Sequence, residues 1–129
     1  PFRAKVSLAQ SSKEVREIAA IVNLNTPANQ KIGNYRLTEW NPKHAMLFYS
    51  NRIVDRSITR DSQELIKQLS AHPEKTWLTS IQEFRNLMAL HPDKLYLIQG
   101  NSRFAFFTSK KSQENIRYDF SNMQLPIVK

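Results

Sequence analysis

The sequence predicts an α/β domain in three layers (α/β/α), with helices on both sides of a mostly parallel sheet that ends in an antiparallel edge hairpin. Helical and strand-like spacings of apolar residues alternate along the chain, a helix–turn–strand unit occurs twice in succession, and a hairpin pattern follows the second unit. The 129 residues have the size of one domain. We therefore expect a single soluble domain over residues 1–129, and the start at Pro1 indicates a piece of a larger protein.

The first helix is expected to begin at Ser11. Ser11-Ser12-Lys13-Glu14 has the capping-box pattern, in which a serine hydroxyl accepts an amide hydrogen bond and the glutamate reaches back to the cap. An apolar stripe with helical spacing follows, formed by Val15, Ile18, Ala19 and Val22. Asn25-Thr26-Pro27 is expected to end this helix.

Three shorter elements follow. Residues 31–37 are expected to form a strand. Asn41 and Pro42 read as a helix N-cap followed by a proline in the first turn, which predicts a short helix through Tyr49. Residues 52–58 are expected to form a second strand.

A near-repeat occupies the middle of the chain. Residues 64–78 align with residues 83–97, and the alignment brings His72-Pro73-Glu74-Lys75 onto His91-Pro92-Asp93-Lys94. Each copy reads as helix, turn and strand, because a proline disfavours helix at the residue before it. Helix starts are expected at Asp61 with Glu64 and at Ser80 with Glu83; the strands are expected at residues 76–78 and 95–98.

The last part of the chain predicts the edge hairpin. Gly100-Asn101 separates residues 95–99 from residues 103–108, a spacing that suits a two-residue turn. A polar loop is expected over residues 110–115, and a short strand over residues 116–120 before a tail that contains Pro126.

Composition limits the chemistry. The chain has no cysteine, which excludes disulfides, thiolate nucleophiles and cysteine-based zinc sites, and its two glycines cannot build a glycine-rich phosphate loop. No serine lies in a G-x-S-x-G elbow. His72 and His91 precede prolines at helix ends, where they suit capping better than metal binding, and His44 lacks ligand spacing with Glu39 or Asp55. We therefore expect no catalytic, metal or cofactor-binding residue in this domain.

The net charge of +8 is the main pointer to partners, because such a field attracts phosphates or anionic headgroups. A solvated basic face is the commoner explanation for dispersed lysines and arginines. The functional interpretation places a ligand where aromatic residues lie close to Arg52, Arg56 and Arg60. The candidate ligand-binding residues are Tyr49, Arg52, Arg56 and Trp40. An aromatic-glycine RNA-binding signature is absent, and no nucleic acid is expected.

Four runs carry a resemblance to a known family. They are Ile18-Ala19-Ala20-Ile21, Ile32-Gly33-Asn34-Tyr35-Arg36-Leu37, Met46-Leu47-Phe48-Tyr49-Ser50-Asn51-Arg52-Ile53-Val54 and Ser62-Gln63-Glu64-Leu65. Together they make residues 18–87 resemble the soluble C-terminal domain of the polyprenyl-phosphate-sugar-dependent membrane glycosyltransferases, the superfamily of the dolichyl-phosphate-mannose-protein mannosyltransferases and aminoarabinose transferases. Members of the family commonly have Leu-Pro before Phe-Tyr, where this sequence has Met46-Leu47.

The resemblance implies a membrane-associated transferase whose catalytic carboxylates belong to loops between membrane helices. This chain would be its periplasmic or exoplasmic accessory domain, with the transmembrane domain, a polyprenyl-phosphate-sugar donor and a lipid or protein acceptor as partners. A divalent metal, if the full-length enzyme uses one, would lie outside this domain. Two alternatives stay open, a free-standing basic module that binds acidic ligands or nucleic acid, and a small intracellular enzyme.

Overall fold

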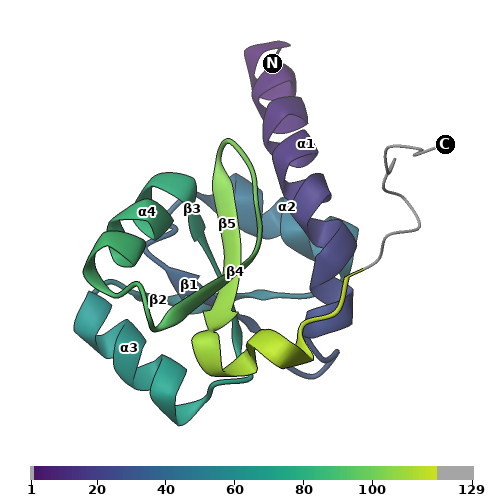
Figure 1. Cartoon of the computed structure of the whole chain (residues 1–129). Helices are drawn as coiled ribbons and strands as arrows, with labels where there is room; N and C mark the ends of the chain where they lie inside the picture. Colours follow the sequence, from purple (N-terminus) through teal and green to yellow (C-terminus); the bar gives the residue numbers. More distant parts are fainter. Residues whose placement is uncertain (1, 119–129) are drawn as a thin grey trace, which may run out of the picture.

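The computed structural model describes the backbone of residues 2–118 and the side chains of residues 13–39 and 42–118. Helices and strands alternate along most of the chain, and the strands form one mixed sheet (Figure 1). The elements are α1 (Phe2–Asn25), β1 (Ile32–Tyr35), α2 (Trp40–Ser50), β2 (Val54–Thr59), α3 (Ser62–Ala71), β3 (Thr76–Ser80), α4 (Ile81–Leu90), β4 (Leu95–Gly100), β5 (Phe104–Ser109) and the 3₁₀ helix η1 (Lys110–Asn115). The predicted α/β class is confirmed.

The five strands lie in the order β2-β1-β3-β5-β4. Strand β1 pairs in parallel with β2 and β3, whereas β5 pairs antiparallel with both β3 and β4. Consequently β4 points the same way as β1, β2 and β3, and β5 runs against them. The two repeat strands β3 and β4 are therefore not neighbours, because β5 folds back between them.

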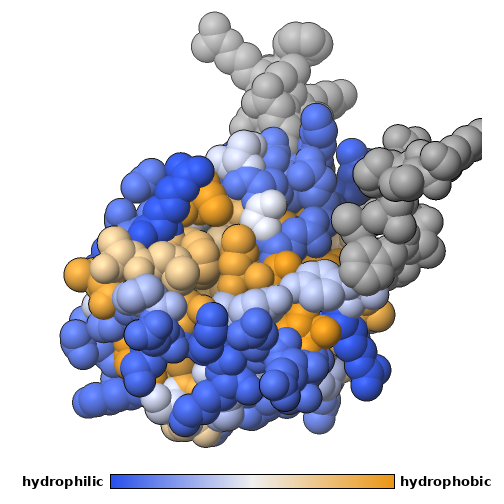
Figure 2. Space-filling view, in the orientation of Figure 1, coloured by the Kyte–Doolittle hydropathy of each residue, from blue (hydrophilic) through white to orange (hydrophobic). Residues whose placement is uncertain are grey.

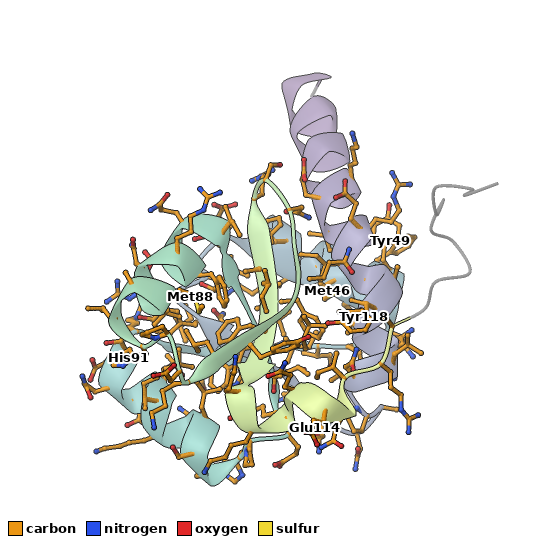
Figure 3. The ribbon with its side chains drawn as sticks, in the orientation of Figure 1. Met46, Tyr49, Met88, His91, Glu114 and Tyr118 are labelled. Atoms are coloured by element: carbon orange, nitrogen blue, oxygen red, sulfur yellow. The ribbon has the colours of Figure 1, made fainter. Side chains whose placement is uncertain are left out.

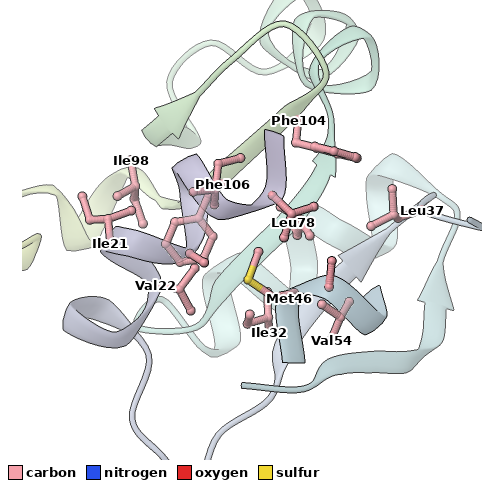
Figure 4. Packing of buried hydrophobic residues seen from close by; sticks show 14 residues of the cluster. Ile21, Val22, Ile32, Leu37, Met46, Val54, Leu78, Ile98, Phe104 and Phe106 are labelled. Carbon is pink, nitrogen blue, oxygen red and sulfur yellow. The ribbon is translucent and has the colours of Figure 1, made fainter. Parts of the chain in front are cut away.

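Two apolar cores lie on opposite faces of the sheet. The first lies between the sheet and α1 with α2, and it includes Val22, Met46, Leu78 and Phe106 (Figure 4). The second lies between the sheet and α3 with α4, and Phe107 belongs to it. Successive residues of β5 alternate between the two cores, as the period of a strand requires.

Helix α1 begins at Phe2, so the expected start at Ser11 was wrong. Residues 2–10 contain neither glycine nor proline, and nothing in them stops a helix from extending through the capping-box pattern. The end of α1 at Asn25 is as expected, and its N-terminal part extends past the sheet (Figure 1). Glu14 and Glu17 mark where α1 meets the hairpin, because their carbonyls accept hydrogen bonds from Asn101 Nδ2 and Gln99 Nε2.

The start of α2 and the hairpin turn also differ from expectation. Helix α2 begins at Trp40, with Glu39 rather than Asn41 at the N-cap position, and Pro42 is still within the first turn, where no amide needs a helical partner. The hairpin loop has three residues, 101–103. Asn101 Oδ1 accepts from the amides of Arg103 and Phe104, and these bonds stabilise the longer loop.

The two repeat units fold alike, as predicted. Asp61 Oδ1 accepts from Gln63 N at 3.2 Å and caps α3; Ser80 Oγ accepts from Glu83 N at 3.1 Å and caps α4. Both helices end at a histidine with similar backbone angles. The following turns match as well, since Lys75 N donates to His72 O and Lys94 N to His91 O.

The segment after β5 differs from expectation in two places: a helix replaces the expected loop, and the expected strand after it is absent from residues 116–118. Residues 110–115 form η1 instead of a loop, because Ser109 Oγ caps Lys111 N and Ser112 Oγ bonds the carbonyl of Pro73. Residues 116–118 do not form the expected strand. Residues 119 and 120 of that strand, and Pro126, lie outside the described residues.

Candidate functional site

The four candidate ligand-binding residues are distributed over α2, β2 and the turn between them. Trp40 is the first residue of α2, and its side chain lies outside the described residues. Tyr49 lies near the end of α2, Arg52 lies in the turn before β2, and Arg56 lies on β2. The structure gives Tyr49 and Arg52 different surroundings, although they are three positions apart.

Three consecutive apolar side chains lie exposed on the last turns of α2, and we call them the α2 surface. They are Leu47, Phe48 and Tyr49, exposed by 41%, 76% and 37%. The rings of Phe48 and Tyr49 meet edge to face with centroids 5.0 Å apart. The guanidinium of Arg16 in α1 lies 5.6 Å from the Tyr49 ring centroid, and Tyr49 lies beside α1 on the outside of the domain (Figure 3).

Phe48 points outward because other residues of α2 form its inner face. Ala45 and Met46 belong to the first core, and Met46 is fully buried. Ser50 is also buried, and its hydroxyl donates to Met46 O at 2.6 Å. Because an α-helix has 3.6 residues per turn, Leu47 and Phe48 lie on the side of α2 that faces solvent.

Arg52 holds two chain turns together. Its Nε donates to Thr26 O at 2.8 Å, just after α1, and Nη1 approaches the carbonyls of Ser50 and Asn51 at 3.4 and 3.2 Å. The guanidinium therefore satisfies carbonyls at the end of α2, where positive charge also complements the helix dipole. This geometry gives Arg52 a structural role, and its role in ligand binding stays a prediction.

The arginines grouped in sequence are spread along the edge strand. Arg56 is exposed on β2, and Arg60 follows the strand at the opposite end from Arg52. The Arg60 carbonyl accepts from Arg36 Nε at 2.6 Å. The face drawn in Figure 2 is mainly hydrophilic, with apolar residues between the polar ones. Arg52, Arg56 and Arg60 therefore lie at separate places along β2 and do not form one cluster.

Ion pairs occupy the carboxyl ends of β1 and β3, the edge where open α/β sheets commonly bind ligands. Arg36 has a left-handed backbone with φ of 54°, and its Nη1 lies 3.4 Å from Glu83 Oε2. Nearby in the fold, Arg103 Nη2 lies 3.5 Å from Glu39 Oε2. Sequence reasoning missed both pairs because their members are far apart in the chain.

Two hollows lie at the opposite edge of the sheet, beside the loops that precede β1 and β3. The larger is about 420 Å³ and is lined by Asn29, Gln30, Lys31, His72, Glu74 and Lys75. The smaller is about 230 Å³ and shares Gln30 and Glu74 with it. Lys75 is partly neutralised, since its Nζ lies 3.8 Å from Asp55 Oδ2.

His72 and His91 lie at the ends of α3 and α4, as the sequence indicated, and the role of their imidazoles at these ends stays a prediction. Both residues hold the C-cap positions, and their backbone amides donate to Gln68 O and Leu87 O. His44 is exposed on α2. Within the described residues, no three histidine, aspartate or glutamate side chains lie close enough to hold a metal ion.

The part of the chain that the structure describes contains no helix that is both long enough and apolar enough to cross a membrane. Comparisons with models of protein families, with curated proteins and with solved structures found no match.

Proposed function

We propose that this chain is an exoplasmic accessory domain of an integral-membrane glycosyltransferase, which transfers a sugar from a polyprenyl-phosphate donor to a lipid or protein acceptor. The transferase would carry its catalytic residues in a transmembrane domain. The accessory domain would pack beside that domain and shape access to the reacting groups. The resemblance of residues 18–87 motivates this proposal.

The supporting observation concerns residues 46–54, the run that resembles the family. Arg52 in this run donates a hydrogen bond to Thr26 O and stabilises the turn after α2. Phe48, which is 76% exposed, and Tyr49 point outward from α2. Aromatic side chains displayed on a rigid helix suit contact with an apolar partner. Helix α1, whose N-terminal part extends past the sheet, packs with α2 in the first core, on one face of the sheet (Figure 1).

We also propose the three-layer α/β/α class with a parallel majority. Four strands point one way and β5 runs against them. The two cores lie between the sheet and separate helix pairs. Both features support this class.

The proposal is tested by sugar transfer in membranes that contain the full-length protein. Membranes with the complete protein should transfer labelled sugar from a polyprenyl-phosphate donor, and the purified 129-residue chain should not. Turnover of the donor by the isolated chain would contradict the proposal. Absence of transfer by the full-length protein across mannosyl, glucosyl and aminoarabinosyl donors would contradict it as well.

The exposed arginines can be tested in the same assay. Replacing Arg56 and Arg60 by glutamine should raise the Michaelis constant for the lipid donor if their charge attracts its phosphate. Lys67→Gln, an exposed change on α3, is the matched control. An unchanged Michaelis constant would remove donor attraction from the proposal.

A second candidate function is a module that binds acidic ligands. The +8 charge and the lysines beside the larger hollow favour it. Binding of the isolated chain to duplex DNA, with an affinity that falls steeply as salt rises, would favour this candidate over the first.

A further inference from the structure

The α2 surface stands out among the exposed apolar residues of the described chain. The others are separated from one another along the sequence: Leu24, Ile53, Leu90, Leu97 and Tyr118. Leu47, Phe48 and Tyr49 instead lie together at the end of α2, the rings of Phe48 and Tyr49 are in contact, and Phe48 is the most exposed of these residues at 76%. Scattered apolar residues are normal on a protein surface, whereas a contiguous group indicates a contact site.

The α2 surface is held in place. Ala45 and Met46 anchor α2 in the first core, and the Tyr49 ring contacts both Phe48 and Arg16. Arg52 fastens the end of the helix to the turn after α1. A partner would therefore contact an ordered helix rather than a loop that must first become ordered. This lowers the entropic cost of binding.

Charge around the α2 surface selects the kind of partner. Residues 40–53 contain Lys43, His44 and Arg52 and no aspartate or glutamate, and Arg16 lies against Tyr49. The acidic groups nearest in sequence are Glu17, Glu39 and Asp55; Glu39 is paired with Arg103 and Asp55 with Lys75. With Glu17 as the remaining carboxylate, Arg16, Lys43 and Arg52 leave the surroundings of the aromatic pair net basic. Aromatic and leucine side chains flanked by cations are typical of helices that lie in the interface of an anionic bilayer.

We infer that the α2 surface docks on an anionic lipid bilayer, with Phe48 inserted at the level of the headgroups and Arg16 and Lys43 facing the lipid phosphates. The inference deepens the proposed function and rests on it for the presence of a membrane. It assigns the bilayer itself, rather than the donor or acceptor, as the partner of this face.

The test is co-sedimentation of the purified chain with vesicles of phosphatidylcholine, with and without phosphatidylglycerol. Wild type should bind the anionic vesicles and not the neutral ones. Phe48→Ser should weaken binding about tenfold or more, since a phenylalanine side chain leaves the interface. Leu90→Ser is the matched control, because Leu90 is 66% exposed and lies on α4, against the other core.

Two lysine variants test whether electrostatic attraction to the lipids contributes to binding in addition to apolar contact. Lys43→Gln should weaken binding about fivefold, as expected for one lysine near an anionic surface. Lys67→Gln, on α3 at the other face of the sheet, should leave binding unchanged. Equal effects of the two lysine variants would overturn the inference.

A gain-of-signal variant guards against misfolding as a cause of lost binding. Phe48→Trp should keep vesicle binding, and the emission of the added tryptophan should shift to the blue and be quenched by brominated lipid. A wild-type chain that binds no vesicle, or an emission from the added tryptophan that does not change with vesicles, overturns the inference.

Self-association that Phe48→Ser abolishes, without vesicle binding, would assign the face to a second copy. Sugar transfer by the full-length protein is measured separately, so failure of lipid docking and failure of the proposed function remain distinguishable.

Discussion

Gly33 in β1 lies directly beneath the ring of Trp77. A Cβ atom at this position would come within 2.3 Å of Trp77 Cε3 and 2.4 Å of Cδ2. The two residues are partners in the β1–β3 ladder, and Trp77 is 1% exposed, so neither side can move away easily. The glycine is therefore required for the close approach of ring and backbone rather than for a turn.

Gly33→Ala should lower the free energy of unfolding by about 1–3 kcal/mol, because an added methyl group overpacks the second core. Urea denaturation followed by circular dichroism measures this. Gly100→Ala is the control, since its Cβ would meet only ordinary contacts of 3.4–3.5 Å. Equal stability of the two variants would show that the Trp77 ring adapts.

Arg52 and Arg56 look equivalent in the sequence, but their side chains contact different groups. Arg52→Gln should lower the free energy of unfolding by about 1–3 kcal/mol, because it leaves carbonyls of two turns without their donor. Arg56→Gln should change it by less than about 0.5 kcal/mol, as usual for an exposed residue. Chemical denaturation of both variants checks the contrast, and a reversed order would contradict the assigned role of Arg52.

At the scale of elements, the helix starts of the repeat were predictable because an N-cap acts over only three residues. Asp61 and Ser80 cap α3 and α4 in the structure as the sequence indicated. The start of α1 was not predictable in the same way. A capping pattern at Ser11 permits a helix start but does not forbid a helix that already runs through it.

Ser80→Ala should lower the free energy of unfolding by about 1 kcal/mol, because the amide of Glu83 loses its acceptor at the N-terminus of α4. Ser70→Ala, an exposed change within α3, supplies the control and should stay within about 0.5 kcal/mol of wild type. Thermal unfolding compares them, and a neutral Ser80 variant would mean that the cap contributes little.

The residues after η1 meet β4 through two tyrosines. The hydroxyls of Tyr96 and Tyr118 lie 3.2 Å apart. Burial, followed by the hydrogen bond to Tyr96, raises the pKa of Tyr118 from 10.0 to about 12. Because the folded pKa is the higher one, this contribution to stability is complete below pH 10.0 and is lost as the pH rises toward about 12.

Tyr96→Phe should lower the pKa of Tyr118 toward 10.0, since it removes the hydrogen bond to the neutral phenol. Phenolate absorbance, titrated as the difference between each protein and the same protein carrying Tyr118→Phe, isolates this group. An unchanged pKa after the substitution would assign the whole shift to burial.

At the scale of the molecule, β5 joins the two cores. Phe106 belongs to the first core and Phe107 to the second, and both side chains are fully buried. Phe106→Ala and Phe107→Ala should each lower the free energy of unfolding by about 3–5 kcal/mol. If one cooperative domain is present, far-ultraviolet circular dichroism and tryptophan fluorescence should give coincident transitions for wild type and both variants. Separate transitions would contradict a single domain.

The sequence by itself determined the α/β class, the alternation of elements and the two repeat units, because apolar periodicity, caps and prolines act over a few residues. Of the candidate site, it indicated that Tyr49 and Arg52 were of interest, but not that one faces outward and the other is tied to Thr26 O. Only the tertiary structure decided that β5 lies between β3 and β4, that Gly33 accommodates Trp77, and that Arg36 meets Glu83. These features join residues distant in sequence, and packing, not local propensity, sets which of them meet.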